Sequence, residues 1–225
     1  ESVSNALFQA SEESADWIVA PEGLMPIGEN LFLNAPISFL TGGFRWSHGQ
    51  QRSSLLAFEQ GDKHYSTFVD KHRLVPLGEW VPSLFGLGFP GLSSVGGVAP
   101  GSSSRLLRWS GPEAAVAICY EISNGSSLLE AVNEGAEWLV SIANLDPYPL
   151  LLQYQYTYIS QIRSIETGRD LLNASNTGPS ILISSTGEVS QLLPPFIEGV
   201  TLTKLHFYKR LTGYTLWKEY PLVLL

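Results

Sequence analysis

The chain has 225 residues, of which 44% are hydrophobic and 15% are charged, and its formal net charge is −8. This composition excludes a disordered chain, and the length favours one large domain. The chain has only 13 Lys and Arg residues, so nucleic acid is excluded as a partner because phosphate binding needs clustered basic residues. The single cysteine excludes an internal disulfide and a cysteine-based zinc site, and the four histidines lack metal-ligand spacing, so no metal site is expected.

The predicted elements alternate short apolar or β-branched runs with helical and Gly/Pro-rich stretches. An amphipathic helix is expected at 1–15, and further helices are expected at 127–134 and 150–167, each followed by a glycine. Strands are expected at 17–20, 37–45, 53–59, 64–71, 105–109, 114–120, 138–143, 171–176, 180–185 and 200–207. Near-continuous apolar runs at 114–120 and 138–143 predict strands covered on both faces, and hence an α/β layered sandwich with mixed sheets.

Three further segments bear on the organisation of the chain. Residues 79–104 are rich in Gly and Pro and lack periodicity, so they predict a long loop that acts as a lid or binding element. The acidic residues 1–16 do not resemble a signal peptide, and no segment reaches the roughly 20 apolar residues that span a bilayer. Because the chain opens within a helix and stops within the apolar run 220–225, we expect it to be a piece of a longer protein.

Cys119 is the strongest candidate for chemistry, because it ends an apolar strand just before a polar turn. A strand end holds a nucleophile rigidly while the following loop exposes it. Tyr120 and Glu121 follow directly, and if the strand continues, Glu121 lies on the same face as the thiol. The ordinary alternative is that Cys119 is a small buried hydrophobe.

Three charged residues accompany the thiol, each with an ordinary alternative. Glu22 ends a strand and is either a surface acid or a general base. Lys71 ends another strand and is either solvated or aimed at a developing oxyanion. Glu79 is either a plain loop acid or a group that orients Lys71.

Taken in order, the segments around these residues carry a resemblance. Ala-Pro-Glu-Gly (20–23), Lys-x-x-Leu-Val-Pro-x-Gly-Glu-x-x-Pro (71–82) and Ile-Cys-Tyr-Glu-Ile (118–122) resemble the Glu-Lys-Cys triad segments of the nitrilase, or carbon–nitrogen hydrolase, superfamily. The tract Val-Pro-Leu-Gly-Glu-Trp-Val-Pro and the later Arg163-Ser-Ile-Glu-Thr-Gly-Arg are more narrowly similar to its apolipoprotein N-acyltransferase branch. The resemblance spans residues 17–190.

The resemblance implies a four-layer αββα nitrilase-type sandwich whose first core strand is missing here. It also implies residue roles: Glu22 as general base, Lys71 as oxyanion-stabilising cation and Cys119 as nucleophile. Glu79 would position Lys71, and Tyr120, Glu121 and Asn144 would support the site. Residues 1–211 would form the catalytic domain, and residues 212–225 would connect it to a C-terminal transmembrane helix.

The activity implied is a transfer of an acyl chain. Cys119 would attack a phospholipid ester to form a thioester, and the amine of a diacylated apolipoprotein would then take the acyl chain, with no cofactor or metal. The membrane would be reached through missing transmembrane segments, and the domain would lie on the periplasmic side of the bacterial inner membrane. The apolar loop that carries Phe85 and Phe89 would contact lipid.

One departure and two alternatives remain. Where the family usually continues Ser-Asn-Asp-Ala-Trp-Phe-Gly, this chain reads Ala-Asn-Leu-Asp-Pro-Tyr-Pro over 143–149, which keeps Asn144 but replaces the aromatic-glycine lid element. The first alternative is a soluble nitrilase-type amidase that hydrolyses a C–N bond with the same triad. The second is a triad-bearing fold used for protein binding, which an altered triad would favour.

Overall fold

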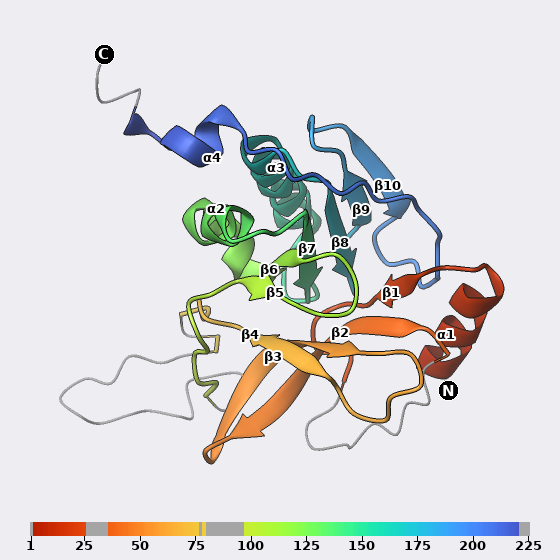
Figure 1. Cartoon of the computed structure of the whole chain (residues 1–225). Coiled ribbons are helices and arrows are strands. Elements are labelled where there is room, and N and C mark those ends of the chain that lie inside the picture. Colours follow the sequence, from red (N-terminus) through yellow and green to blue (C-terminus); the bar gives the residue numbers. More distant parts are fainter. Residues whose placement is uncertain (1, 26–35, 77, 80–96, 221–225) are drawn as a thin grey trace.

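The computed structural model describes residues 2–25, 36–76, 78–79 and 97–220, which form two β-sheets with helices on their outer faces (Figure 1). The helices are α1 (Ser2–Glu12), α2 (Gly125–Asn133), α3 (Leu150–Thr167), α4 (Gly213–Trp217) and the 3₁₀ helix η2 (Cys119–Ser123). The four-stranded sheet has the order β1 (Trp17–Val19), β2 (Ser38–Ser47), β3 (Gln50–Phe58), β4 (Thr67–Asp70). The six-stranded sheet has the order β10 (Val189–Leu193), β9 (Ser180–Ile183), β8 (Leu171–Ser175), β7 (Trp138–Ala143), β6 (Ala114–Ile118), β5 (Leu106–Leu107).

Three apolar clusters define four layers. Side chains of both sheets meet between the sheets, where Leu40 and Leu55 lie in one cluster with Val116 and Val140. A second cluster lies between α1 and the outer face of the four-stranded sheet. A third joins the outer face of the six-stranded sheet to α2 and α3. This arrangement confirms the expected αββα sandwich, in which each sheet buries both faces.

The central strands behave as their sequences predict. Every residue of β6 and β7 is buried, and the two strands pair in parallel. Along β6 the side chains alternate, with Val116 and Ile118 between the sheets and Ala117 toward the helices. A parallel strand covered on both faces has no solvent-facing side, which explains the unbroken apolar runs.

The helix ends also follow from the sequence. Helix α3 ends at Gly168, which adopts a left-handed conformation with φ 62° and donates its N–H to Ser164 O. Helix α2 ends just before Gly135, whose φ of 125° few other residues adopt. Both glycines mark the predicted ends of these helices.

Two predicted strands need correction, and one strand was missed. The expected strand 200–207 is wrong, because that segment forms no ladder and the His206 N–H donates to the Asp170 carboxylate instead. The edge strand β10 was not predicted, since its Val-Ser-Gln pattern is largely exposed. The strand expected over 114–120 ends at Ile118, and η2 begins at Cys119.

The topology brings the ends of several strands together. Strands β6, β7 and β8 are mutually parallel, so their carboxyl ends lie at one edge of the sheet. Residues that follow β1 and β4 in the other sheet approach this edge. The carboxylate of Glu22, which follows β1, accepts a hydrogen bond from the N–H of Asn144, the residue after β7. Ligands of open α/β sheets bind outside such carboxyl ends, so a functional site is expected at this edge.

Candidate active site

Glu22, Lys71 and Glu79 form a buried ionic cluster at the carboxyl ends of the strands. Lys71 Nζ donates to Glu22 Oε1 at 3.0 Å and to Glu79 Oε1 at 2.6 Å. The lysine side chain is only 1% exposed, and those of Glu22 and Glu79 are 9% and 14% exposed. A buried ammonium of this kind is stable only when carboxylates neutralise it, and here two do so.

Small residues of the two middle strands make room for this cluster. A Cβ atom added at Gly42 would lie 2.3 Å from the Cα atom of Glu22, so the glycine lets the chain after β1 approach β2 closely. On β3, the Ser53 carbonyl accepts from Lys71 N–H at 2.8 Å, and its hydroxyl donates to Glu22 Oε1 at 3.4 Å. Neither residue was identified from the sequence, since small residues in a strand carry no chemical signal of their own.

Cys119 lies at the turn from β6 into η2 and is 6% exposed. Its φ of 51° places a non-glycine residue in the left-handed region, which costs on the order of 1–3 kcal/mol. Such strain is typical of a nucleophile held on a sharp strand-to-helix turn. The backbone N–H of Tyr120 interacts with the sulfur and acts to lower the pKa of Cys119, which favours the thiolate.

The cluster and the thiol act on each other electrostatically. Burial, and then the Glu22 carboxylate, raise the pKa of Cys119 to about 12, against the opposing effect of the Lys71 ammonium. Burial lowers the pKa of Lys71, but Glu22, Cys119 and Glu79 outweigh it and raise that pKa well above its ordinary value. At neutral pH the site therefore holds a thiol beside a lysine that stays charged.

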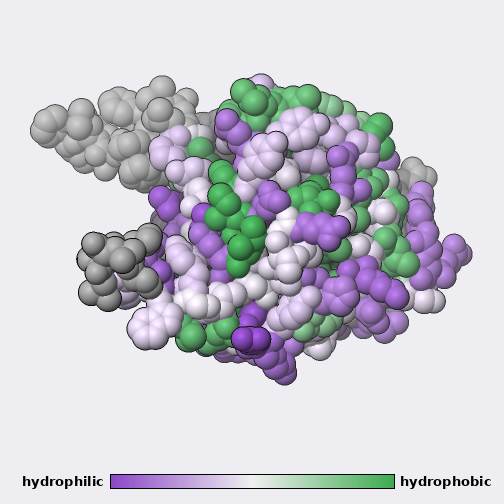
Figure 2. Space-filling view, turned by 90° about the horizontal axis from the view of Figure 1, so that it is seen from above, coloured by the Kyte–Doolittle hydropathy of each residue, from purple (hydrophilic) through white to green (hydrophobic). Residues whose placement is uncertain are grey.

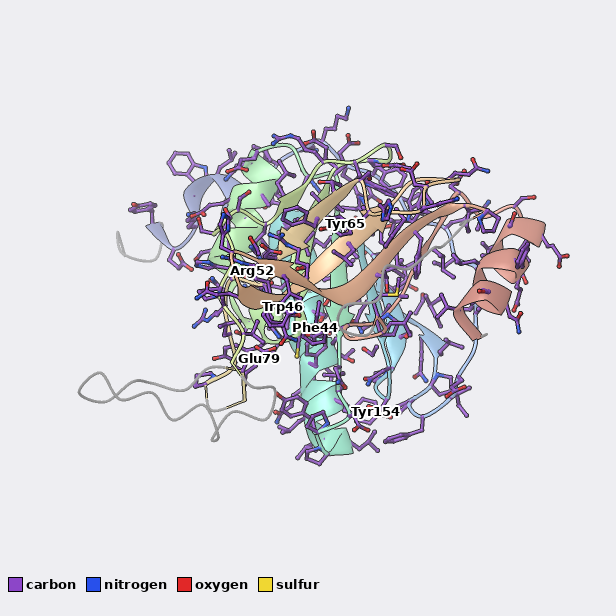
Figure 3. The ribbon with its side chains drawn as sticks, turned by 90° about the horizontal axis from the view of Figure 1, so that it is seen from below. Phe44, Trp46, Arg52, Tyr65, Glu79 and Tyr154 are labelled. Atoms are coloured by element: carbon purple, nitrogen blue, oxygen red, sulfur yellow. The ribbon has the colours of Figure 1, made fainter. Side chains whose placement is uncertain are left out.

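Glu79 is itself held in place by the backbone. Its second carboxylate oxygen accepts from Val75 N–H at 2.9 Å, and its carbonyl accepts from Val98 N–H at 3.0 Å. Ala99 N–H in turn donates to Gln51 O of the β2–β3 hairpin. Figure 3, seen from below, labels Glu79 together with Arg52 and Trp46 of this hairpin. The contacts thus fit the predicted position of Glu79 next to Lys71.

Glu121 is placed differently from the prediction, because the strand does not continue past Ile118. Its carboxylate is 2% exposed and pairs with Arg105 at 2.9 Å. It also accepts hydrogen bonds from the backbone N–H groups of Ile118, His72 and Arg73. Glu121 therefore ties the end of β6 to the segment that follows Lys71. Arg105 was missed, since its local sequence, Ser-Arg-Leu-Leu-Arg, gives no sign of a distant partner.

The remaining predicted residues fall into three groups. Asn144 N–H donates to Glu22 Oε2 at 3.0 Å, which joins the end of β7 to the cluster. The Tyr120 side chain is 40% exposed and its ring lies below the Arg73 guanidinium, away from the buried cluster. Phe85 and Phe89 lie outside the described residues.

The described residues show neither a metal-binding group nor a membrane-spanning helix. Within 2–25, 36–76, 78–79 and 97–220, no group of three or more His, Cys, Asp or Glu side chains is arranged to hold a metal ion. In the same part of the chain, no helix combines the length and the apolar character that crossing a bilayer requires.

Sequence comparison finds close relatives, although no protein-family model matches the chain. The chain is 58% identical over 99% of its length to an apolipoprotein N-acyltransferase of Prochlorococcus marinus strain MIT 9313, covering 45% of that protein. It is 49% identical to the enzyme of the same name from Parasynechococcus marenigrum strain WH8102, over 95% of the chain and 46% of the relative. The chain thus spans about half the length of the curated relatives that it matches.

Comparison with solved structures finds the same fold at low sequence identity. A carbon–nitrogen hydrolase from Helicobacter pylori G27 matches with a TM-score of 0.64 at 15% identity, over 84% of this chain and 78% of that one. An amidase from Nesterenkonia sp. AN1, with an acetamide moiety on its active-site cysteine, matches with a TM-score of 0.65 at 15% identity, over 86% of this chain and 79% of that one.

Proposed function

The chain belongs to the apolipoprotein N-acyltransferase family and has the nitrilase-superfamily fold, and we propose that it is the catalytic part of such an enzyme. In this proposal Cys119 is the nucleophile, Glu22 the general base and Lys71 the oxyanion-stabilising cation. Glu79 positions Lys71, and Glu121 and Asn144 hold the surrounding segments. The reaction moves an acyl chain from a phospholipid to the amine of a diacylated apolipoprotein.

The observation that carries the proposal is the position of Lys71. Its ammonium lies between Glu22 and Glu79 at 3.0 and 2.6 Å, and it interacts electrostatically with Cys119. One carboxylate, Glu79, can keep the ammonium in place while the other, Glu22, exchanges a proton. A base, a fixed cation and a thiol in one buried cluster are what covalent acyl transfer requires.

The first half-reaction forms a thioester. Glu22 accepts the proton of the Cys119 thiol as the sulfur attacks the ester carbonyl of the phospholipid. The tetrahedral oxyanion is stabilised by Lys71 Nζ and by the Tyr120 N–H, which interacts with the sulfur. The C–O bond then breaks, Glu22 returns the proton to the leaving oxygen, and lysophospholipid departs.

The second half-reaction consumes the thioester. The α-amino group of the diacylglyceryl-cysteine attacks the same carbonyl, and Glu22 removes a proton from the attacking nitrogen. The C–S bond breaks, the proton returns to sulfur, and an amide remains on the acceptor. The raised pKa of Cys119 means that the enzyme ends this step as the thiol from which it started.

The membrane setting follows from the same proposal. Residues 1–211 form the catalytic domain, residues 212–225 lead toward a transmembrane helix, and the domain works at the periplasmic side of the inner membrane. The side of the molecule that carries α3 and α4 shows apolar patches among polar ones (Figure 2). Exposed residues there include Leu151, Leu216 and Trp217. Such side chains are compatible with a neighbouring membrane or membrane domain.

The test follows the fate of the acyl chain. The full-length protein is incubated with a phospholipid labelled in its sn-1 chain and with a diacylglyceryl-cysteine peptide. Label in an amide at the peptide N-terminus is the expected result. Label released only as free fatty acid would contradict the acyltransferase and favour the hydrolytic alternative.

A further inference from the structure

Residues 143–149, which differ from the pattern of the family, form one wall of the candidate site. The wall is anchored at its beginning, because Asn144 N–H donates to Glu22 Oε2 at 3.0 Å. The next residue, Leu145, donates its N–H to Asn176 Oδ1 at 2.9 Å, and Asn176 donates back to Asn144 Oδ1 at 2.6 Å. The segment is thus fixed to the proposed base and to the end of β8.

Tyr148 lies at the far end of this wall and is held there by a tight turn. Its N–H donates to Leu145 O at 3.0 Å, and its carbonyl accepts from Gln153 Nε2 at 3.0 Å. Gln153 is 1% exposed and also donates to Leu145 O, so one buried amide clamps both ends of the turn. Pro149 follows as the N-cap of α3, and proline fixes the backbone further. The backbone that carries the Tyr148 side chain is therefore held in place.

Packing and electrostatics make Tyr148 part of the candidate site. Tyr148 is half-buried and packs against the apolar cluster that contains Cys119. Burial, and next the charge of Cys119, raise the pKa of the phenol, so the hydroxyl keeps its proton. Lys71, Glu79 and Glu22 act on it as well. The hydrogen bonds that the described residues give Tyr148 involve its backbone N–H and carbonyl.

We propose that the Tyr148 hydroxyl donates a hydrogen bond to the acyl oxygen of the group carried by Cys119, as a further oxyanion donor beside Lys71 and the Tyr120 N–H. This inference rests on the proposed function. A phenol that packs against the cluster containing Cys119, on a segment bonded to Glu22, can reach the carbonyl that is attacked in both half-reactions, whichever nucleophile attacks it. The donor is preorganised, so its benefit is greatest when negative charge develops on that oxygen.

The test compares Tyr148→Phe with a matched control, Tyr158→Phe, whose tyrosine is 63% exposed on α3. Full-length protein is mixed with a short water-soluble p-nitrophenyl ester, and intact-mass time courses give the rate of thioester formation. An amine acceptor is then added, and the loss of the acyl mass gives the rate of the second step. Tyr148→Phe should slow both steps by a similar factor of about 10 to 10² without changing the half-saturating ester concentration, whereas Tyr158→Phe should slow neither.

Alkylation of Cys119 by iodoacetamide separates this role from a structural one, because alkylation forms no oxyanion. Its rate should be the same in Tyr148→Phe and in the wild type. The inference is overturned if alkylation falls by the same factor, if only the amine step slows, or if neither step changes. A wild-type protein that forms the thioester but transfers nothing to amines would contradict the proposed function instead, and the effect of Tyr148→Phe on acylation would still decide the inference.

Discussion

Lys71 Nζ lies 3.0 Å from Glu22 Oε1, although the two residues follow β4 and β1, the opposite edge strands of the four-stranded sheet. The long lysine side chain reaches across two middle strands that carry small residues, Gly42 and Ser53. The pair therefore depends on the packing of all four strands. Any change that separates these strands should therefore lengthen the distance between Lys71 and Glu22.

Glu79→Gln should lower turnover by about 10²-fold while leaving the fold intact, because the loss of one charge loosens the Lys71 ammonium from its 2.6 Å partner. The substrate concentration at half-maximal rate should change little. The matched control is Glu130→Gln, at an exposed position of α2. Initial rates of acyl transfer check this prediction, and wild-type turnover in Glu79→Gln would reduce Glu79 to a structural acid.

Glu22→Gln should shift the pH dependence of Cys119 alkylation toward lower pH. Burial and then the Glu22 carboxylate raise the pKa of the thiol to about 12, so the wild-type alkylation rate should keep rising above pH 9. Removing the carboxylate removes one cause of the raised pKa and leaves the opposing Lys71 ammonium less neutralised. Iodoacetamide rates measured between pH 7 and about 11 check the direction. An unchanged profile would mean that Glu22 does not act on the thiol.

Arg105→Ala should destabilise the fold by about 3–5 kcal/mol, because it leaves the 2%-exposed Glu121 carboxylate buried without its cation. The control is Arg108→Ala, whose ion pair with Glu113 is 65% and 35% exposed and should be worth about 0–1 kcal/mol. Urea unfolding followed by tryptophan fluorescence gives both values. If both variants lost the same small free energy of unfolding, the Arg105–Glu121 pair would not stabilise the fold.

Replacing Phe85 and Phe89 with Ser should weaken the use of phospholipid far more than the use of a short, water-soluble ester. Both residues lie in the glycine-rich stretch at 79–104 that we expect to contact lipid. The comparison of both substrates on one variant separates lipid contact from chemistry. Equal loss on both would show that the stretch shapes the catalytic centre, and no loss on either would favour the soluble amidase.

Apolar and turn patterns predicted most of the scaffold, because a strand buried on both faces or a helix ended by glycine is encoded locally. Strand β7 and helix α3 have the predicted ranges, and β6 begins where predicted but ends at Ile118. The edge strand β10 was missed because an exposed edge needs no apolar pattern. The segment 200–207 is β-like in composition but forms no strand. Its His206 N–H donates a hydrogen bond to the carboxylate of Asp170, which is distant in the sequence.

The charged members of the site could be predicted because each stands at a strand end within a distinctive local segment. Their supports could not, since these depend on contacts between residues far apart in the chain. Gly42 matters only because Glu22 comes within 2.3 Å of where its Cβ would lie. Arg105 matters only because Glu121 turns away from the strand toward it. The role of Tyr148 depends on the clamp made by Gln153.

The central claim is that Cys119 carries the acyl group, and intact-mass analysis of the full-length protein tests it most directly. After incubation with phospholipid and without acceptor, the wild type should gain the mass of one acyl chain, and a diacylglyceryl-cysteine peptide should then remove it. Cys119→Ala should gain no such mass, because the variant lacks the proposed nucleophile. An acyl mass that persists in Cys119→Ala would place the nucleophile elsewhere and contradict this account.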